Sequence, residues 1–387
     1  MRPARGVTSA VIAMKNDKDD YSILCDFDNL YRAHKDCRKG KRWKESVAIY
    51  DIRGYECTLA LKDLLESGEY RLSPYNCFTL NERGKVRDIK SIKYHDRVVQ
   101  KCLMDEIITP VITKTFVETN CASLKGKGTD FALKKCKDYL RRQVRKSGVN
   151  GYILICDMKG YFDSIPHKIV EDFYETRFED EKILGLIKHI HASIPGGRGE
   201  PLGNQLSQND ALLALSGLDH MIKERLHAKC YVRYMDDFFI ISDDKEYLKG
   251  CRDRIEEWVE AWGMRLNQKK TKIVTTKQGF TFLGFKFYVT DTGKVIQRLA
   301  HKSIVRHKKK LRKMAKLYHE GKMTLEAAKQ SHNGWRAHAI RGDTYYLIRS
   351  MDRLFDELFK PKEENDVKTT FDAPGGNARQ GHEHKVQ

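Results

Sequence analysis

Hydrophobic residues recur with two different spacings along this chain, and the spacings predict a mixture of helices and strands. Apolar residues three and four positions apart are typical of a helix with one buried face, and short apolar or alternating runs are typical of strands. The predicted helices cover residues 55–65, 96–109, 167–193, 204–226, 245–262, 302–322 and 324–358. The predicted strands cover residues 77–80, 85–89, 152–156, 230–242, 273–275 and 280–288. Pro110 is expected to end the second helix, because proline lacks the backbone N–H that continues a helix.

The two ends of the chain lack this patterning. Residues 1–20 contain no apolar signal core. From Pro361 onward the chain is polar, contains glycine and is nearly free of large apolar residues. Such composition cannot bury enough apolar surface to fold. We therefore expect a poorly ordered N-terminus over 1–20 and a disordered tail over 361–387.

The charge of the chain is strongly positive. There are 72 Lys and Arg residues against 53 Asp and Glu residues, which gives a net charge of +19. This excess favours a polyanionic partner, nucleic acid first and an anionic membrane surface second. No stretch of about 18 apolar residues predicts a membrane span. The ten cysteines stand singly, which argues against a zinc ribbon or a disulfide scaffold. We expect a soluble protein of the cytoplasm that handles nucleic acid.

Three acidic residues stand at the edges of apolar strands. Asp157 directly follows the apolar run Tyr152–Cys156, and Asp236 and Asp237 interrupt the β-rich run 230–242. Taken alone, Asp157 could simply end a strand, and the adjacent pair could be a hairpin turn. Like charges on a sheet repel unless a cation neutralises them, and Mg²⁺ is a hard cation that suits carboxylates and phosphate oxygens. Two such ions roughly 3.5–4 Å apart would serve an in-line phosphoryl transfer.

A set of segments in order along the chain resembles the motifs of bacterial reverse transcriptases. The segments are Cys156–Ile165 (motif A), Pro201–Gln208 (motif B), Tyr234–Asp237 (motif C), Leu266–Thr271 (motif D), Phe282–Phe285 (motif E), and Lys85–Arg87 with Asp96–Gln100 in the fingers. The resemblance implies an α+β right-hand polymerase. Its parts would be fingers at 21–150, a palm with an antiparallel sheet and the catalytic centre at 151–290, and a helical thumb at 291–360.

The resemblance also implies a role for each matching residue. The catalytic acids would be Asp157, Asp236 and Asp237, which would hold two Mg²⁺ ions together with the backbone carbonyl of Met158. Mn²⁺ is the expected substitute ion. The expected dNTP-binding residues are Lys85, Arg87, Phe162, Gly203, Gln208 and Lys270.

The resemblance implies a specific role for three of these residues. Phe162 would be a steric gate that excludes a 2′-OH, its alternative being a core phenylalanine. Gly203 would let the backbone approach template and dNTP, because it has no Cβ. Lys270 would protonate the departing pyrophosphate, or act only through its charge.

Other residues are expected to contact nucleic acid. They are Tyr234, Leu283, Gly284, Lys308, Lys309, Lys310, Arg312 and Lys313. The last five lie in the basic run 302–322, which fits a helix that tracks the phosphates of a duplex, or else a solvated basic helix.

Motif B distinguishes among reverse transcriptases. The run Leu202–Gln208 is similar to that of diversity-generating retroelement enzymes, which copy template adenines unfaithfully, and His332–His338 with Gly342–Tyr345 resembles their thumb segment. Asn209 and Asp210 depart from the pattern, because relatives usually carry large apolar residues there. Antiphage-defence reverse transcriptases share much of this motif set and are the alternative. A non-catalytic RNA-binding protein is the remote one.

The resemblance also implies partners and a location. Expected partners are an RNA template, a DNA or RNA primer, the cDNA product and dNTPs. A structured noncoding RNA and a basic accessory protein would join them, in a bacterial cytoplasm and without a membrane.

Overall fold

The computed structural model describes residues 19–82 and 84–360. Residues 1–18 of the predicted poorly ordered N-terminus and the whole predicted tail 361–387 lie outside the described residues. Internal contacts divide the chain into two units, which meet between Ala300 and His301. Each unit is described by itself below.

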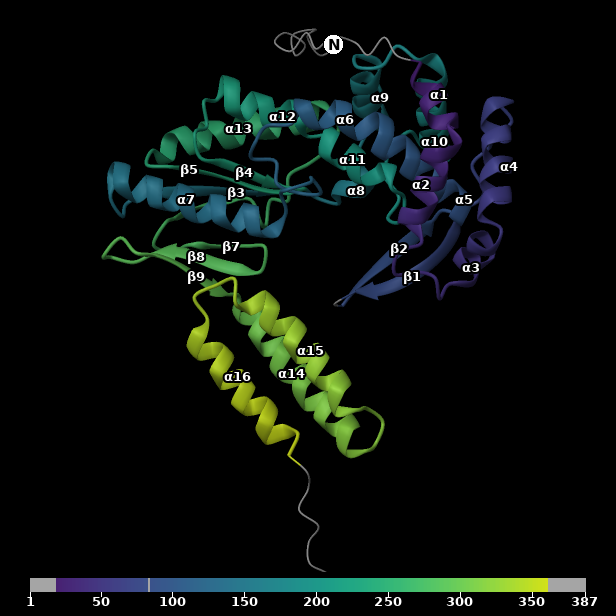
Figure 1. Ribbon diagram of the computed structural model, residues 1–387. Helices are drawn as coiled ribbons and strands as arrows, with labels where there is room; N and C mark the ends of the chain where they lie inside the picture. The colour runs from purple at the N-terminus through teal and green to yellow at the C-terminus, as the bar shows by residue number, and fades with distance from the viewer. Residues whose placement is uncertain (1–18, 83, 361–387) are drawn as a thin grey trace, which may run out of the picture. The chain divides into compact units, whose positions relative to one another are not determined.

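The first unit is organised around a four-stranded antiparallel sheet in the order β4-β5-β3-β6. The strands are β3 (Tyr152–Asp157), β4 (Tyr231–Tyr234), β5 (Asp237–Ser242) and β6 (Lys272–Thr275). Helix α13 (Lys245–Ala261) contacts β3 and β5, and helix α7 (Thr129–Ser147) contacts β4 and β5. Figure 1 shows the two helices on opposite faces of this sheet. Burial from both faces explains why the middle residues of β3 and β5 are all apolar.

Two smaller antiparallel sheets belong to the same unit. One is the hairpin β1 (Asn76–Glu82) and β2 (Lys85–Ser91), as predicted from the turn residues between them. The other has three strands, β7 (Phe280–Phe282), β8 (Phe285–Val289) and β9 (Val295–Leu299). The turn between β7 and β8 consists of Leu283 and Gly284, which both have positive φ. Such two-residue turns match the twist of a hairpin. Strand β9 was not predicted.

Helices surround these sheets. Among the described residues, the remaining α-helices of the first unit are α1 (Asp20–Cys25), α2 (Phe27–Cys37), α3 (Glu45–Ile52), α4 (Gly54–Glu66), α5 (Tyr94–Cys102), α6 (Thr109–Ile112), α8 (Tyr161–Ser164), α9 (His167–Glu175), α10 (Glu181–Ala192), α11 (Leu206–Leu213) and α12 (Ser216–His220). Two predictions were wrong in detail. Pro110 does not end a helix: it lies in the first turn of α6, which follows the π-helix Leu103–Ile108 without a break. The predicted helices 167–193 and 204–226 are each broken, the first at residues 176–180.

The second unit is a bundle of three helices with its own core. They are α14 (His301–His319), α15 (Leu325–Ala339) and α16 (Tyr345–Leu358), and they bury Leu311, Met314, Ala328, Met351 and Phe355. His332 Nδ1 lies 2.9 Å from His307 Nε2, and His332 Nε2 lies 2.9 Å from Asp352 Oδ1. Trp335 stacks on His307 with ring centroids 4.3 Å apart. Burial, with a smaller effect of His332, lowers the pKa of His307 to about 4.

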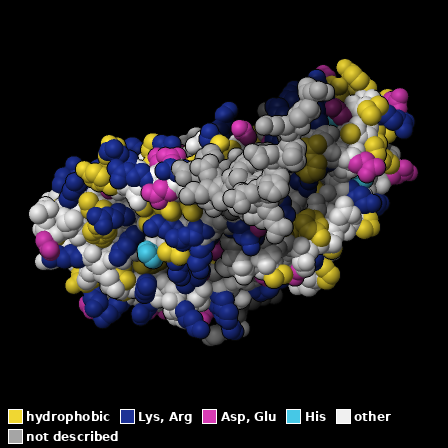
Figure 2. Space-filling model, turned by 90° about the horizontal axis from the view of Figure 1, so that it is seen from below, with side chains coloured by type: hydrophobic (Ala, Val, Ile, Leu, Met, Phe, Trp, Pro, Cys, Tyr) yellow, Lys and Arg dark blue, Asp and Glu magenta, His cyan; other side chains and the backbone are white. Residues whose placement is uncertain are grey.

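Basic side chains cover the outer side of α14. Lys309, Lys310, Arg312 and Lys313 are exposed, and Lys308 is half-buried. Figure 2 shows Lys and Arg side chains spread over the described part of one face of the molecule, with fewer acidic ones among them. The apolar positions of α14 therefore serve the bundle core, while its basic positions remain available to a polyanion.

All ten cysteines are free thiols. Among the residues that the structure describes, none of the helices combines the length and the apolar character that crossing a bilayer requires.

Candidate active site

The three predicted acids converge at one end of the central sheet. Asp157 ends β3 and Asp237 begins β5, and the antiparallel register pairs these two residues directly across the strands. Side chains at directly opposed positions lie on the same face of a sheet. Asp236 occupies the two-residue turn between β4 and β5. The preceding residue of this turn, Met235, has φ +57°, a backbone conformation that non-glycine residues rarely adopt and that is enriched at functional sites.

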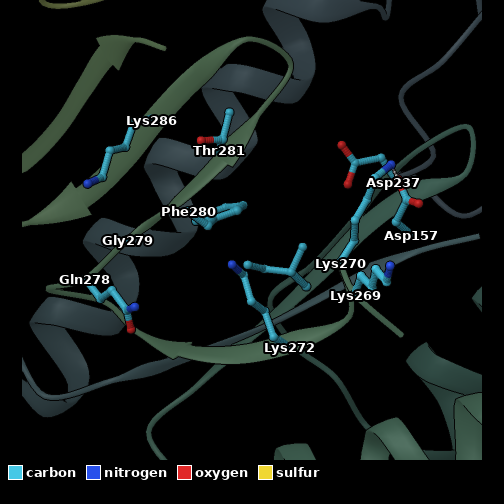
Figure 3. Close-up of a pocket in the computed structure, with 11 residues that line it drawn as sticks. Asp157, Asp237, Lys269, Lys270, Lys272, Gln278, Gly279, Phe280, Thr281 and Lys286 are labelled. Carbon is cyan, nitrogen blue, oxygen red and sulfur yellow. Dashed lines mark hydrogen bonds and ion pairs between the residues drawn. The ribbon is translucent and has the colours of Figure 1, made fainter. Parts of the chain in front are cut away.

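The charge of this cluster is only partly balanced by the protein. Burial, followed by the charges of Asp157 and Asp236, raises the pKa of Asp237 to about 7. Lys270 Nζ lies 2.6 Å from Asp157 Oδ2. The hydrogen bond to Asp157 raises the pKa of Lys270, so the lysine remains charged. Figure 3 shows Lys270 extending toward the two aspartates.

The loop before β6 holds Asp157 in place from a second direction. Asn267 Nδ2 donates to Asp157 Oδ1 over 3.1 Å, and the Asn267 backbone N–H donates to the Asp157 carbonyl over 2.7 Å. The Met158 backbone N–H donates to the Asp236 carbonyl over 3.3 Å. These contacts tie the end of β3 to both the turn and the loop.

The acids fit a divalent-cation site. The strand pairing places Asp157 opposite Asp237, and Asp236 lies in the adjoining turn. The ammonium group of Lys270 already contacts Asp157 in the place of a metal cation. Carboxylate oxygens are the ligands that Mg²⁺ prefers. Burial is the main cause of the raised pKa of Asp237, and repulsion from Asp157 and Asp236 adds to it. A cation at this position would relieve that repulsion.

A buried ion pair supports the turn from beneath, and sequence patterning did not identify it. Arg233 and Asp219 are both fully buried, with Arg233 Nη2 2.6 Å from Asp219 Oδ2 and Nε 2.8 Å from Oδ1. Arg233 Nη1 also donates to the carbonyl of Met235 over 3.1 Å. Arg233 therefore holds the backbone of the strained turn that carries Asp236. The available signal was an arginine inside an otherwise apolar strand, which requires a buried acid as partner.

A cavity of about 520 Å³ opens beside the acids. Figure 3 shows it between the loop that leads into β6 and the strands β7 and β8. Its lining includes Asp157 and Asp237 together with four lysines, Lys269, Lys270, Lys272 and Lys286. A pocket with acids at one side and four ammonium groups around the rest suits a metal-bound polyphosphate or a nucleic-acid backbone.

Motif B lies against the hairpin β1–β2. Gly203 has φ +120°, and a Cβ built on it would lie 3.1 Å from the carbonyl oxygen of Lys90. The Lys90 N–H donates to the Leu202 carbonyl over 3.2 Å, and Arg97 Nη2 donates to the Gly203 carbonyl over 3.2 Å. The close approach that requires glycine here is therefore to strand β2. Gln208 is exposed on α11.

The other predicted substrate residues occupy separate elements. Phe162 lies in α8 and is half-buried, and its carbonyl accepts a hydrogen bond from the Glu200 N–H over 2.7 Å. Lys85 and Arg87 lie on β2, and Arg87 is half-buried. Tyr234 is half-buried at the end of β4, and Leu283 and Gly284 form the β7–β8 turn. Within the described residues, Arg87, Phe162, Gly203 and Gln208 lie outside the lining of the cavity.

Comparison with known proteins gives a family match over this region. The family model described as reverse transcriptase (RNA-dependent DNA polymerase) matches residues 79–287. The protein YkfC of Escherichia coli (strain K12) is 23% identical over 268 residues, which are 58% of this chain and 70% of that protein.

Two solved telomerase structures are also similar. Apo telomerase from Candida tropicalis, truncated from its C-terminal domain, has a TM-score of 0.44 and 15% identity, over 62% of this chain and 59% of that chain. Telomerase from Candida albicans, in complex with a TWJ fragment of telomeric RNA, has a TM-score of 0.46 and 14% identity, over 79% of this chain and 64% of that chain. This chain spans less than two thirds of either telomerase chain.

Proposed function

The chain belongs to the reverse transcriptase family of RNA-directed DNA polymerases, and we propose that it synthesises cDNA by adding dNTPs to a primer 3′-OH opposite an RNA template. Its fold is that family's right-hand polymerase, with helices and antiparallel sheets. The single observation that carries the catalytic proposal is the cross-strand pair of Asp157 and Asp237, with Asp236 in the adjoining turn.

The acids would hold the divalent ions of the reaction. Asp157, Asp236, Asp237 and the Met158 carbonyl are the proposed ligands of two Mg²⁺ ions, for which Mn²⁺ is an alternative. Bound ions of this kind neutralise charge on the attacking and leaving oxygens of an in-line phosphoryl transfer. The protein's own task is to position the reacting groups and surround them with fixed charge. The lysines of the cavity fit that task, because they lie beside the acids. Lys270 competes with the metal ions for Asp157, whereas the other three lysines do not.

Substrate selection would come from three elements around the acids. Phe162 is the proposed gate against a 2′-OH, and its half-buried position in α8 supports a ring that is held by packing while one side stays accessible. Lys85 and Arg87 on β2 would contact the triphosphate through charge-assisted hydrogen bonds. Gln208, exposed on α11, would face the incoming nucleotide, and Gly203 would set the distance between motif B and β2.

Template and primer would be held mainly through their backbones. Leu283 and Gly284 form a tight turn that fits a primer grip, and Tyr234 ends the strand that leads to Asp236. The exposed basic residues of α14, with Lys308, would contact phosphates, which position a duplex without reading its sequence.

The proposed biological role is cDNA synthesis in a diversity-generating retroelement, with errors at template adenines. It rests on the motif B run Leu202–Gln208. Leu202 cannot make the hydrogen bonds that glutamine makes at that place, so pairing would be checked less strictly. Sequencing of the cDNA tests this role, and a uniformly low error at template adenines would exclude it.

Antiphage defence with a noncoding RNA is the second candidate. It is favoured by Asn209 and Asp210, which depart from the retroelement pattern. A genomic neighbourhood with a template and variable repeat pair would support diversification. A structured RNA among defence genes would support immunity.

Primer extension on an RNA template tests the catalytic proposal. Asp236→Ala should reduce dNTP incorporation by at least about 100-fold, because it removes one carboxylate of the proposed metal centre. Asp253→Ala, an exposed substitution on α13, is the matched control and should leave incorporation unchanged. Equal incorporation by wild type and Asp236→Ala would overturn the assignment. No incorporation by either protein with the cognate RNA supplied would instead favour the remote alternative of a non-catalytic RNA-binding protein.

A further inference from the structure

A second cluster of ionisable side chains lies away from the catalytic acids. His191 on α10, Glu200 in the loop before α11, and Asp210 on α11 are all buried. Each offers one oxygen or nitrogen atom, and these atoms all lie within 4.8 Å of one another. We propose that His191, Glu200 and Asp210 bind a Zn²⁺ ion that fastens the motif B segment to helix α10.

Two of these groups lie nearly as far apart as two ligands on one ion. His191 Nε2 lies 3.1 Å from Asp210 Oδ2. Ligands about 2.0–2.2 Å from zinc in a tetrahedral arrangement lie roughly 3.3–3.6 Å apart, so a small widening of this pair would admit the ion. Glu200 is 4% exposed, and its Oε1 is buried without a hydrogen-bond partner. A buried carboxylate oxygen without a partner is unstable unless a cation or a proton satisfies it. One carboxylate oxygen of Glu200 already lies within 4.8 Å of the ligand atoms of His191 and Asp210.

The surrounding hydrogen bonds are those that support metal ligands. The other ring nitrogen of His191, Nδ1, lies 3.0 Å from Glu171 Oε1, which fixes the tautomer that leaves Nε2 free to bind. Tyr174 donates its hydroxyl to Asp210 Oδ1 over 2.7 Å, leaving Oδ2 for the ion. His167 stacks on the His191 ring with centroids 5.0 Å apart and so fixes its plane. Ligand orientation by outer hydrogen bonds of this kind is typical of metal sites.

Charge balance points to the same ion. Two ionised carboxylates and a neutral imidazole carry a charge of −2, which one divalent cation neutralises. Without the ion, the same balance needs two protons, one on His191 and one on Glu200. Burial and the charge of Asp210 do raise the pKa of Glu200, and the bond to Asp210 raises that of His191 against the effect of burial. A set of one imidazole and two carboxylates favours Zn²⁺ over Mg²⁺, which prefers oxygen alone.

The proposed ion would act on the position of motif B. Glu200 precedes Gly203 by three residues, and Asp210 follows Gln208 by two on the same segment. The Glu200 N–H also bonds the Phe162 carbonyl, so the loop reaches the proposed gate. The ion would therefore hold the loop, α11 and α10 as one piece. Its binding depends on none of the catalytic acids.

Metal analysis of the full chain tests the proposal directly. The protein is stripped with a chelator, dialysed against Zn²⁺ buffered at nanomolar concentration, and analysed by mass spectrometry for bound metal. The variant Asp157→Asn/Asp236→Asn serves as the background, because it removes the catalytic carboxylates. We expect about one Zn²⁺ per chain in both proteins. If the wild type binds less than about a tenth of a Zn²⁺ ion per chain, the proposal is overturned. This outcome does not depend on whether any variant folds.

Substitutions then locate the ion. Glu171→Gln, which removes the carboxylate that bonds His191 Nδ1, should weaken zinc binding about 10- to 100-fold. Glu200→Gln should weaken it at least as much. Glu175→Gln removes a carboxylate from the same helix as Glu171, where it pairs with Lys188, and is the matched control. Equal zinc content in Glu171→Gln, Glu200→Gln and the control would overturn the assignment. The visible absorption of Co²⁺ in place of Zn²⁺ gives an independent readout: its bands should appear with wild type and disappear with Glu200→Gln.

Discussion

Lys270 Nζ lies 2.6 Å from Asp157 Oδ2, so the lysine ammonium group contacts an oxygen that is a proposed ligand of the catalytic metal. Lys270→Met should lower the Mg²⁺ concentration for half-maximal activity several-fold, because the ion no longer competes with the ammonium group. The same change should lower kcat about 10- to 100-fold if Lys270 assists the leaving pyrophosphate. Titration of primer extension with Mg²⁺ measures both. Lys272→Met removes an equal charge from the same cavity, and an identical Mg²⁺ dependence in the two variants would contradict the prediction.

Asp237 should make the metal-free protein less stable as pH rises. Its pKa is about 7 in the folded protein, raised first by burial, and about 3.9 in an unfolded chain. Between these values the folded state binds more protons, so stability is lost as pH rises from about 4 to about 7 and levels off above. Asp237→Asn should remove this loss and stabilise the metal-free protein at pH 8, on the order of 2 kcal/mol, while abolishing activity.

Urea denaturation in EDTA at pH 5 and pH 8 measures the effect. Asp243→Asn is a control of opposite sign, because hydrogen bonds from Ser147 and Lys146 lower the pKa of Asp243 to about 2. That substitution should destabilise the protein at pH 8. If Asp237→Asn has the same stability as wild type at pH 8, the raised pKa of Asp237 is refuted.

Gly203→Ala should destabilise the protein and impair polymerisation together. The new Cβ would press on the Lys90 carbonyl, and φ +120° is strained for alanine, which costs about 1–3 kcal/mol. Gly185→Ala is the control, because Gly185 is exposed within α10 with no atom near its Cβ position. That change should be neutral or stabilising by about 0.5–1 kcal/mol. Thermal denaturation of wild type, Gly203→Ala and Gly185→Ala measures the effect. Equal melting temperatures would show that the close contact between Gly203 and β2 is not required.

Arg233→Met should be among the most damaging substitutions outside the acids. It leaves Asp219 charged and buried, which costs about 3–5 kcal/mol, and it removes the donor to the Met235 carbonyl. The double variant Arg233→Met/Asp219→Leu should regain most of the stability, because no unpaired charge remains. Its activity should stay low, since the turn that carries Asp236 has lost its support. Recovery of full activity in the double variant would rule out the supporting role.

Phe162→Ala tests the proposed gate. The preference for dNTP over the matching rNTP, measured as a ratio of kcat/KM values, should fall on the order of 10- to 100-fold. The control is Phe173→Ala on α9, a half-buried phenylalanine that packs at the edge of the core. An unchanged ratio in Phe162→Ala would identify Phe162 as a packing residue.

Patterning along the sequence predicted those parts of the site that lie on continuous strands. The run Tyr152–Cys156 forms β3, and Asp157 ends it, because a strand buried on both faces is apolar until it reaches an edge. The turn at Asp236 was foreseeable for the same reason. The roles proposed for Phe162 and Gln208 remain predictions, since they concern a substrate.

Contacts between distant segments were not predictable in this way. Arg233 finds its partner Asp219 on a helix, and nothing local distinguishes that aspartate from a surface one. Asp210 was noted only as a departure from a pattern. Its meaning depends on His191 and Glu200, which only the fold brings to it. Lys270 meets Asp157 because the loop at Asn267 folds back on the end of β3.

The self-contained core of the three-helix unit has a consequence for evolution. Because Leu311, Met351 and Phe355 pack within that unit, its stability is decided by its own sequence. Substitutions on its basic surface can therefore accumulate without disturbing the strand pairing of Asp157 and Asp237. Changes in how tightly the basic surface of α14 binds a polyanion would then leave the paired aspartates of the first unit as they are.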